Sequence, residues 1–216
     1  MRTYHKIESL FERDVTGTKK LIEGEFRNPA VEYLKDCVWQ FTEKIDGTNI
    51  RVCWDGHRVT YGGRTERANI PVHLLNRLLC LFGTKEAEEL FEQQFGENEV
   101  VLFGEGYGHK IQNGGLYRSD VDFILFDVMI CGNYQPRNAV ESIAKMFGID
   151  AVPVLFEGTI EEGVAFVKAK PMSTIGKAPM EGVVARPKVE LRDRFGNRLI
   201  VKIKVADFKE SQKHDS

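Results

Sequence analysis

The stretch "QFTEKIDGTNIRV" (residues 40–52) alternates apolar and polar residues on both sides of a short charged interruption. Alternation with a period of two is typical of half-buried β-strands, so this stretch predicts two strands that meet near Lys44 and Asp46. Gly47 suits the turn because glycine adopts backbone conformations that other residues avoid. Taken alone, the stretch fits a hairpin with a charged turn as well as a strand that presents a nucleophilic lysine.

The overall composition is that of an ordinary soluble globular protein. Of the 216 residues, 42% are hydrophobic and 29% are charged, and no apolar run is long enough for a transmembrane helix. The N-terminal segment "MRTYHKIESLFERD" lacks the apolar stretch of a signal peptide, so a cytoplasmic location without a membrane partner is expected. The net charge of −2 does not by itself indicate a nucleic-acid binder.

The cysteines argue against a zinc site. They occur singly, without CxxC spacing, at Cys37, Cys53, Cys80 and Cys131. Reduced and partly buried thiols are therefore expected.

Outward from the opening stretch, periodicity and turn residues predict a mixture of strands and helices. Strands are expected at residues 38–44, 48–63 (a hairpin turning at "WDGH"), 99–108 (a strand followed by a glycine-rich loop), 122–130, 180–187 and 197–208. Helices are expected at 71–83, 85–99, 136–149 and 159–170. Because the order lacks strict βαβ alternation, an α+β fold with a mainly antiparallel sheet is predicted. No repeat or linker interrupts the chain, which favours one domain over 1–216 with the segment 1–37 packing on it.

The C-terminal part of the sequence is rich in cations. They are Lys168, Lys170, Lys177, Arg186, Lys188, Arg192, Arg194, Arg198, Lys202 and Lys204. Such a segment is either a solvated surface or a local basic face.

Five further short motifs follow "EKIDGTN" in a fixed order. They are "YGGRT", "FGEGYG", "DFILFDV", "MEGVVARP" and "IVKIK". One Lys-x-Asp-Gly match is weak, but the ordered set, over residues 38–208, resembles the covalent nucleotidyltransferase superfamily of ATP-dependent ligases and capping enzymes. Within it, "GEGYGHKIQNGG" followed by "DFILFDV" is most similar to the RNA ligase branch typified by the T4 phage RNA ligase 2 family. The resemblance implies a nucleotidyltransferase fold, the ATP-grasp-like fold of ligase adenylation domains, with mainly antiparallel sheets flanked by helices.

The resemblance implies that Lys44 attacks the α-phosphate of ATP, forming lysyl–AMP and releasing pyrophosphate. Lys202 and Lys204 lie two residues apart on an expected strand, so they share one face and are expected to neutralise the phosphates. Glu181 is expected to bind the catalytic Mg²⁺ or Mn²⁺, directly or through water. The alternative for "IVKIKV" is an amphipathic strand with its lysines in water.

The remaining nucleotide contacts are implied by the same resemblance. Asp46 is expected near the nucleophile and the metal, through water, and Asn49 at a phosphate during strand joining, although Asn49 also suits a plain turn. Arg64 is expected at phosphate and ribose, and Glu105 at the ribose hydroxyls. Phe126 is expected to stack on adenine.

The implied function is an ATP-dependent RNA ligase in RNA repair. It would join RNA ends that carry a 5′-phosphate and a 3′-OH, in a nicked duplex or a single strand. Lys110 and Arg186 are candidate contacts to this RNA, with a plain surface role as the alternative. A DNA ligase, a capping-type guanylyltransferase and a non-catalytic nucleotide-binding module remain alternatives.

The sequence after "VKIK" is short, comprising residues 205–216. Many superfamily members carry an OB-fold or helical domain at this point, and none is expected here. The chain is therefore expected to be a minimal ligase, to need an accessory protein in place of that domain, or to be truncated.

Overall fold

The computed structural model describes residues 3–17 and 20–208. They fall into two compact units. Of the described residues, the first unit contains 3–5 and 45–152, and the second contains 6–17, 20–44 and 153–208. The chain passes from the second unit into the first directly after Lys44.

The first unit contains a largely antiparallel sheet with helices. Its strands are β5 (Thr48–Trp54), β6 (Val59–Gly63), β7 (Val100–Gly108), β8 (Val121–Ile130), β9 (Asn133–Tyr134) and β10 (Asp150–Ala151). Its helices are α2 (Val72–Phe82), α3 (Lys85–Phe95), α4 (Arg137–Met146) and the short 3₁₀ turn η1 (Gly114–Leu116). The strand order is β10-β8-β7-β5-β6, with β9 beside β8, and β10 pairs with β8 in parallel.

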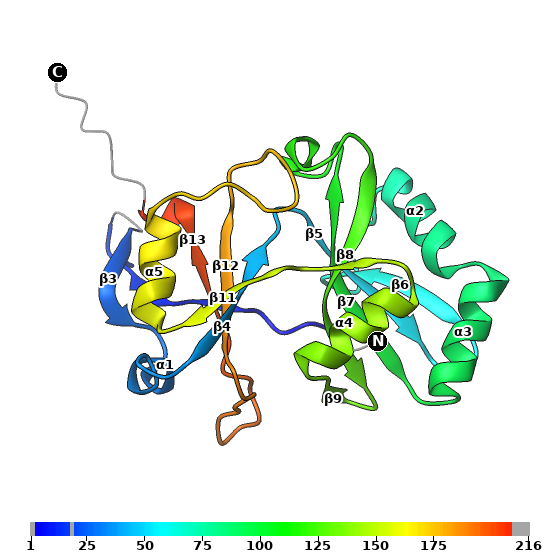
Figure 1. Cartoon of the computed structure of the whole chain (residues 1–216), viewed down its shortest axis with the longest axis horizontal. Coiled ribbons are helices and arrows are strands. Elements are labelled where there is room, and N and C mark those ends of the chain that lie inside the picture. The colour runs from blue at the N-terminus through cyan, green and yellow to red at the C-terminus, as the bar shows by residue number, and fades with distance from the viewer. Residues whose placement is uncertain (1–2, 18–19, 209–216) are drawn as a thin grey trace. The chain divides into compact units, whose positions relative to one another are not determined.

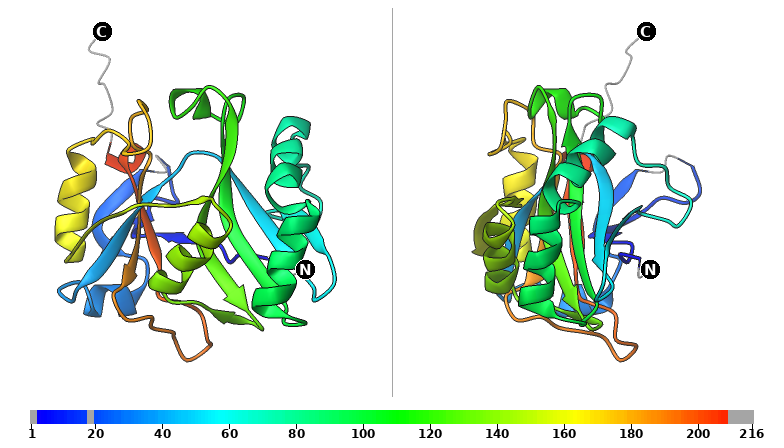
Figure 2. Two further views of the ribbon diagram at one scale, coloured as in Figure 1. Left: turned by 45° about the vertical axis from the view of Figure 1, so that its right-hand side comes forward. Right: turned by 90° about the vertical axis from the view of Figure 1, so that its right-hand side faces the viewer.

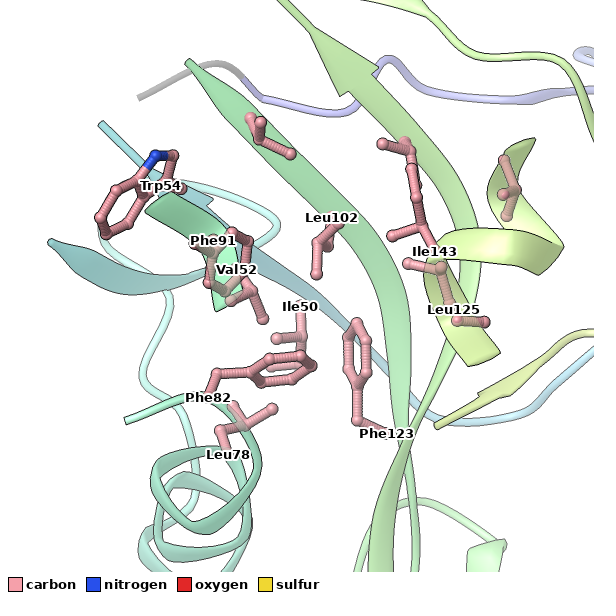
Figure 3. Packing of buried hydrophobic residues seen from close by; sticks show 14 of the residues in the cluster. Ile50, Val52, Trp54, Leu78, Phe82, Phe91, Leu102, Phe123, Leu125 and Ile143 are labelled. Atoms are coloured by element: carbon pink, nitrogen blue, oxygen red, sulfur yellow. The ribbon is translucent and has the colours of Figure 1, made fainter. Parts of the chain in front are cut away.

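One apolar core joins the three helices to the sheet of the first unit. In α2, Leu74, Leu78 and Phe82 recur every four residues and are fully buried, which is the spacing of one helix face. Figure 3 shows Phe82 beside Phe123 of β8, and their rings meet edge to face at 5.6 Å. Figure 2 shows α2 and α3 along one side of this sheet.

The prediction that "EVVLFGEGYG" ends in a glycine-rich loop is wrong, because β7 runs through both of the inner glycines as far as Gly108. A Cβ on Gly104 would lie 2.3 Å from the ring of Phe123, and one on Gly106 would lie 2.4 Å from Leu74 Cδ2. The glycines are there because side chains from β8 and α2 pack directly on the strand backbone.

The second unit is built on another mainly antiparallel sheet (Figure 1). Its strands are β1 (Glu8–Ser9), β4 (Trp39–Lys44), β11 (Val154–Gly158), β12 (Gly182–Pro187) and β13 (Val201–Lys204), with β2 (Phe11–Arg13) and β3 (Leu21–Phe26) forming a separate pair. Its helices are α1 (Pro29–Tyr33), α5 (Ile160–Lys168) and the 3₁₀ turn η2 (Val205–Phe208). The main sheet has the order β1-β13-β12-β4-β11, and β1 runs parallel to β13.

Helix α5 begins where the sequence predicts. Thr159 accepts a hydrogen bond from the backbone N–H of Glu162, and the Glu162 carboxylate accepts one from the backbone N–H of Thr159. This reciprocal capping box satisfies two N–H groups that the first helical turn cannot pair. The helix then packs Ile160, Val164 and Val167 into the core of the unit.

The strand predicted over residues 197–208 is shorter than expected. Before β13, the backbone N–H of Leu199 donates to the carbonyl of Leu191 in a separate hairpin. After β13, the chain turns into η2, where the N–H of Val205 donates to the carbonyl of Glu181. Local alternation continues through these residues, but only four of them pair as strand β13.

The α+β fold class expected from the sequence is confirmed. The structure is a mixture of helices and mostly antiparallel sheets. All four cysteines are free, and burial raises the pKa of Cys53 to about 11, which keeps this thiol protonated at neutral pH. Within residues 3–17 and 20–208, no helix has the length and apolar character needed to span a membrane.

Candidate active site

Three neighbouring strands of the second unit align Lys44, Glu181 and Lys204. Gly182, the first residue of β12, pairs with Lys44 on β4 and with Lys204 on β13. Adjacent strands lie about 4.8 Å apart, so the two lysines flank the residue that follows Glu181. Figure 1 shows β4, β12 and β13 side by side in this order.

The side chains of these residues meet in a bridged ion pair. Lys44 Nζ lies 2.6 Å from Glu181 Oε2, and Lys204 Nζ lies 2.6 Å from Glu181 Oε1. The exposed fractions are 24% for Lys44, 18% for Glu181 and 32% for Lys204, so the group is reachable from solvent but partly shielded from it. One carboxylate thus offsets the repulsion of two ammonium groups and fixes both of them at one end of the sheet.

Lys202 lies on the same strand as Lys204. Val201 and Ile203 of β13 are buried, whereas Lys202 and Lys204 are partly exposed, so the two lysines share the open face of the strand. This agrees with the two-residue period of a strand.

Glu43, which the sequence analysis did not identify, anchors the segment that leads to Glu181. Its buried carboxylate accepts hydrogen bonds from Ser173 Oγ at 2.5 Å, from Thr174 Oγ1 at 2.6 Å and from the Thr174 backbone N–H at 3.0 Å. The alternation of β4 contained a signal, because Glu43 shares the inward face with Phe41. A buried carboxylate needs such donors, so Glu43 is a structural anchor beside Lys44.

A substitution at Gly182 tests whether the alignment of Lys44, Glu181 and Lys204 depends on close packing between the strands. Its φ is 155°, and a Cβ there would lie 2.1 Å from the carbonyl oxygen of Ile203 and 2.8 Å from Lys204 Cα. We expect Gly182→Ala to lower the free energy of unfolding by about 2–3 kcal/mol, because backbone atoms of β13 would have to move. Urea denaturation measures this loss.

Gly24→Ala is the matched control in the same unit. Gly24 also has a positive φ, of 90°, but a Cβ there would meet no atom within 4 Å. Its loss should be about 1 kcal/mol. Equal losses in the two variants would contradict the importance of strand contact at Gly182.

Asp46 belongs to the first unit, where the loop after β7 holds it. Its Oδ2 accepts a hydrogen bond from Asn113 Nδ2 at 3.0 Å, and its backbone N–H donates to Tyr117 Oη at 3.3 Å. At Gly47 a Cβ would lie 2.4 Å from the carbonyl oxygen of Gly106, so a glycine is required by close backbone approach. No sequence signal pointed to Asn113 or Tyr117, because the loop returns to Asp46 only in the folded unit.

Asn49 and Glu105 lie directly opposite each other on β5 and β7. Both are partly buried, and Asn49 Oδ1 accepts no hydrogen bond from any described residue. Arg64, just beyond β6, and Lys110, in the loop after β7, are exposed. Within the described part of the first unit, neither forms a hydrogen bond or ion pair with the other predicted site residues.

A β-bulge sets the position of Phe126. Phe103 of β7 pairs with Asp127 and Gly104 pairs with Leu125, so the register passes over Phe126. A bulge re-aims the side chain at that point of a strand. The partly exposed ring of Phe126 meets that of Tyr4 edge to face at 5.0 Å, and Tyr4 Oη donates to Asp127 Oδ2 at 2.8 Å. The sequence analysis did not identify Tyr4 as a neighbour of Phe126 and Asp127.

Arg186 lies at the far end of β12 from the lysine pair. It pairs with Gln40, whereas Gly182 pairs with Lys44. Four residues along a strand correspond to about 13 Å, so Arg186 is not part of the Lys44 cluster.

A divalent cation such as Mg²⁺ needs oxygen ligands, and Glu181 is the candidate carboxylate. In the part of the chain that the structure describes, no three side chains of His, Cys, Asp or Glu lie together as a metal site. Mg²⁺ commonly takes one or two protein carboxylates and fills its shell with water and substrate phosphate. Glu181 fits that kind of ion, held largely by water and substrate.

Comparison with known proteins places the chain in a family. The sequence model of a family described as RNA ligase matches residues 38–204. No curated protein sequence gives a significant match.

Solved structures of the Naegleria gruberi RNA ligase share the fold. A lysine-to-alanine variant with ATP and Mn superposes with a TM-score of 0.64 at 19% identity, covering 93% of this chain and 59% of that one. A lysine-to-methionine variant with AMP and Mn gives 0.63 at 20% identity, covering 93% and 60%. The same ligase with PPi gives 0.63 at 21% identity, covering 95% and 61%. The chain therefore spans about three fifths of the length of these relatives.

Proposed function

This chain belongs to the RNA ligase family, and we propose on that premise that it is an ATP-dependent RNA ligase with a nucleotidyltransferase fold. It would join 3′-OH and 5′-phosphate ends through a lysyl–AMP intermediate. The observation that carries the proposal is the bridged cluster of Lys44, Glu181 and Lys204. A lysine amine, a carboxylate and a second cation at one end of a sheet are the groups that a covalent nucleotidyl transfer uses.

In the first step, Lys44 Nζ attacks the α-phosphate of ATP. A nitrogen–phosphorus bond forms, the bond to the bridging oxygen breaks, and pyrophosphate leaves. The amine must lose protons, and Glu181 Oε2, at 2.6 Å, is within reach to accept one. Lys204 and Lys202 would neutralise the phosphates as charge moves to the leaving group.

The second and third steps transfer and release AMP. The 5′-phosphate of an RNA strand attacks lysyl–AMP, which frees Lys44 and leaves a pyrophosphate-linked adenylate. A 3′-OH then attacks the activated phosphate, the new phosphodiester forms, and AMP leaves. A Mg²⁺ or Mn²⁺ ion held through Glu181 would add positive charge at the phosphates. Support for ATP and Mn comes from the N. gruberi RNA ligase, which was solved with both.

The residues of the first unit are proposed to serve the nucleotide and the RNA. Phe126 would stack on adenine, since it lies at the bulge and its ring is partly exposed. Glu105 would accept hydrogen bonds from the ribose. The other proposed contacts, which rest on the resemblance, are Asp46, Asn49 and Arg64 at the phosphates and Lys110 at RNA, together with Arg186 of the second unit. A partner protein would be needed if the chain cannot complete all three steps.

The proposal is tested by labelling the wild-type protein with α-labelled ATP or GTP in the presence of Mg²⁺. We expect an acid-labile covalent adduct from ATP, whose formation is suppressed when excess unlabelled ATP is added with the label and is not suppressed by excess unlabelled GTP. The absence of an ATP adduct would refute the ligase proposal. An adduct formed from GTP alone would instead favour a capping-type guanylyltransferase.

The polynucleotide substrate is decided in a second assay. The adenylated protein is offered 5′-phosphorylated RNA, the DNA of the same sequence, and a nicked duplex of each. We expect AMP to move to the RNA ends and sealed RNA product to appear. Sealing of DNA alone would replace RNA ligase with DNA ligase.

A further inference from the structure

At least half of the ten C-terminal cations lie in ion pairs with glutamates and therefore add little to a basic face. They are Lys168, Lys188, Arg192, Arg198 and Lys204. Arg194 differs from these residues. Its side chain forms no ion pair or hydrogen bond with the described residues, and it lies over the ring of Phe195, 4.7 Å from the ring centroid.

The chain between β12 and β13 forms a hairpin, drawn in orange-brown beyond the end of β12 in Figure 1. Arg194 and Phe195 lie in its turn. Arg192 and Arg198 form an isolated bridge across it, and its turn is closed by the Asp193 N–H, which donates to the carbonyl of Asn197 at 2.9 Å.

The turn itself is held in one shape. Asp193 Oδ1 accepts hydrogen bonds from the backbone N–H groups of Phe195, at 2.8 Å, and Asn197, at 2.9 Å. Asp193 Oδ2 accepts a third from Asn197 Nδ2 at 3.0 Å. Gly196 takes the φ of 82° that the turn requires. An aspartate side chain that accepts hydrogen bonds from the backbone of its own turn fixes the conformation of the residues in that turn.

This ordered turn presents an aromatic ring to solvent. Phe195 is 74% exposed. Its neighbours in "RDRFGNR" (192–198) are polar or charged apart from glycine, with three arginines and one aspartate. Glu190 pairs with Arg192 and Arg198, so Arg194 is the cation that remains available beside the exposed ring. A flat ring with a guanidinium against it suits a ligand that combines a planar base with a phosphate.

We propose that the tip formed by Arg194 and Phe195 is a contact site for single-stranded RNA, in which an unpaired base stacks on Phe195 and Arg194 contacts the adjoining phosphate. Aromatic faces stack on any base, and guanidinium groups both stack on rings and bind phosphate. The site would bind the RNA strand without taking part in the nucleotidyl transfer. It rests on the proposed function only in taking RNA as the substrate.

The test is binding of a fluorescent single-stranded RNA to the full chain without ATP, followed by anisotropy. Phe195→Ala should weaken binding about fivefold or more, the loss of one stacked base, whereas Phe195→Trp should keep it. Arg194→Gln should reduce the slope of log affinity against log salt by about 0.7, the value for one phosphate contact on a single strand. A duplex of the same sequence should respond less to Phe195→Ala, because its bases are already stacked.

Tyr33→Ala is the matched control, since Tyr33 is an aromatic in the same unit that is 87% exposed and lies outside the hairpin. It should bind RNA as the wild type does. RNA binding by Phe195→Ala within twofold of wild type would overturn the proposal and would favour a protein partner as the ligand of the exposed ring. Equal weakening by Tyr33→Ala, or no RNA binding by the wild type, would overturn it as well. The ATP adduct forms without RNA, so failure of the hairpin proposal and failure of the ligase proposal are told apart.

Discussion

Lys44→Ala should form no detectable lysyl–AMP adduct with α-labelled ATP, while remaining folded. The variant lacks the amine that would bond to the α-phosphate, and the nearby Lys204 amine belongs to another strand, β13. Stability should change little. The Lys44–Glu181 pair is partly exposed, and such pairs contribute about 0–1 kcal/mol, so Tm should fall by no more than about 4 °C.

Two further variants separate the loss of the Lys44 amine from the loss of its positive charge. Lys44→Arg keeps a cation that can still pair with Glu181, but a guanidinium stays protonated and is a poor nucleophile, so this variant should also form no adduct. Lys168→Ala removes an exposed lysine that pairs with Glu23, and it should form the adduct at the wild-type rate. Adduct on Lys44→Ala, mapped by mass spectrometry to another residue, would remove Lys44 from its proposed role.

Glu181→Ala should slow adduct formation by about 100-fold or more, the usual cost of removing a preorganised polar group from a reacting centre. Without the carboxylate, Lys44 and Lys204 lose the anion that holds each of them at 2.6 Å, and the two ammonium groups repel each other. The proposed proton acceptor and the proposed carboxylate for the metal are lost at the same time. Single-turnover adenylation with labelled ATP measures the rate.

Glu181→Gln tests how much of this effect is charge. The amide keeps the size of the side chain but removes the negative charge, so we expect a rate close to that of Glu181→Ala. The control is Glu157→Ala, which breaks the exposed pair with Lys188 and should leave the rate unchanged. A rate for Glu181→Ala within threefold of wild type would show that the carboxylate is a structural bridge only.

Several features of this protein follow from the sequence alone because they depend on neighbours in the chain. The alternation in "QFTEKIDGTNIRV" predicts β4 and β5, and "WDGH" predicts the turn between β5 and β6. Thr159 and Glu162 predict the start of α5 through their capping box. Lys202 and Lys204 share a face of β13 since they are two residues apart. The order of the short motifs indicates the family, which the match over residues 38–204 establishes.

The tertiary structure decided which of these groups meet. Lys44 and Glu181 are 137 residues apart, and their contact depends on β12 lying between β4 and β13 in a register that pairs Gly182 with both lysines. The bulge at Phe126 and the hydrogen bond from Asn113 to Asp46 likewise depend on segments distant in the chain. Residue spacing within a strand fixes the face of a side chain, but register between strands is set by packing and close backbone approach. The sequence by itself therefore determined the nucleophile candidate and its strand, and only the folded sheet determined its neighbours.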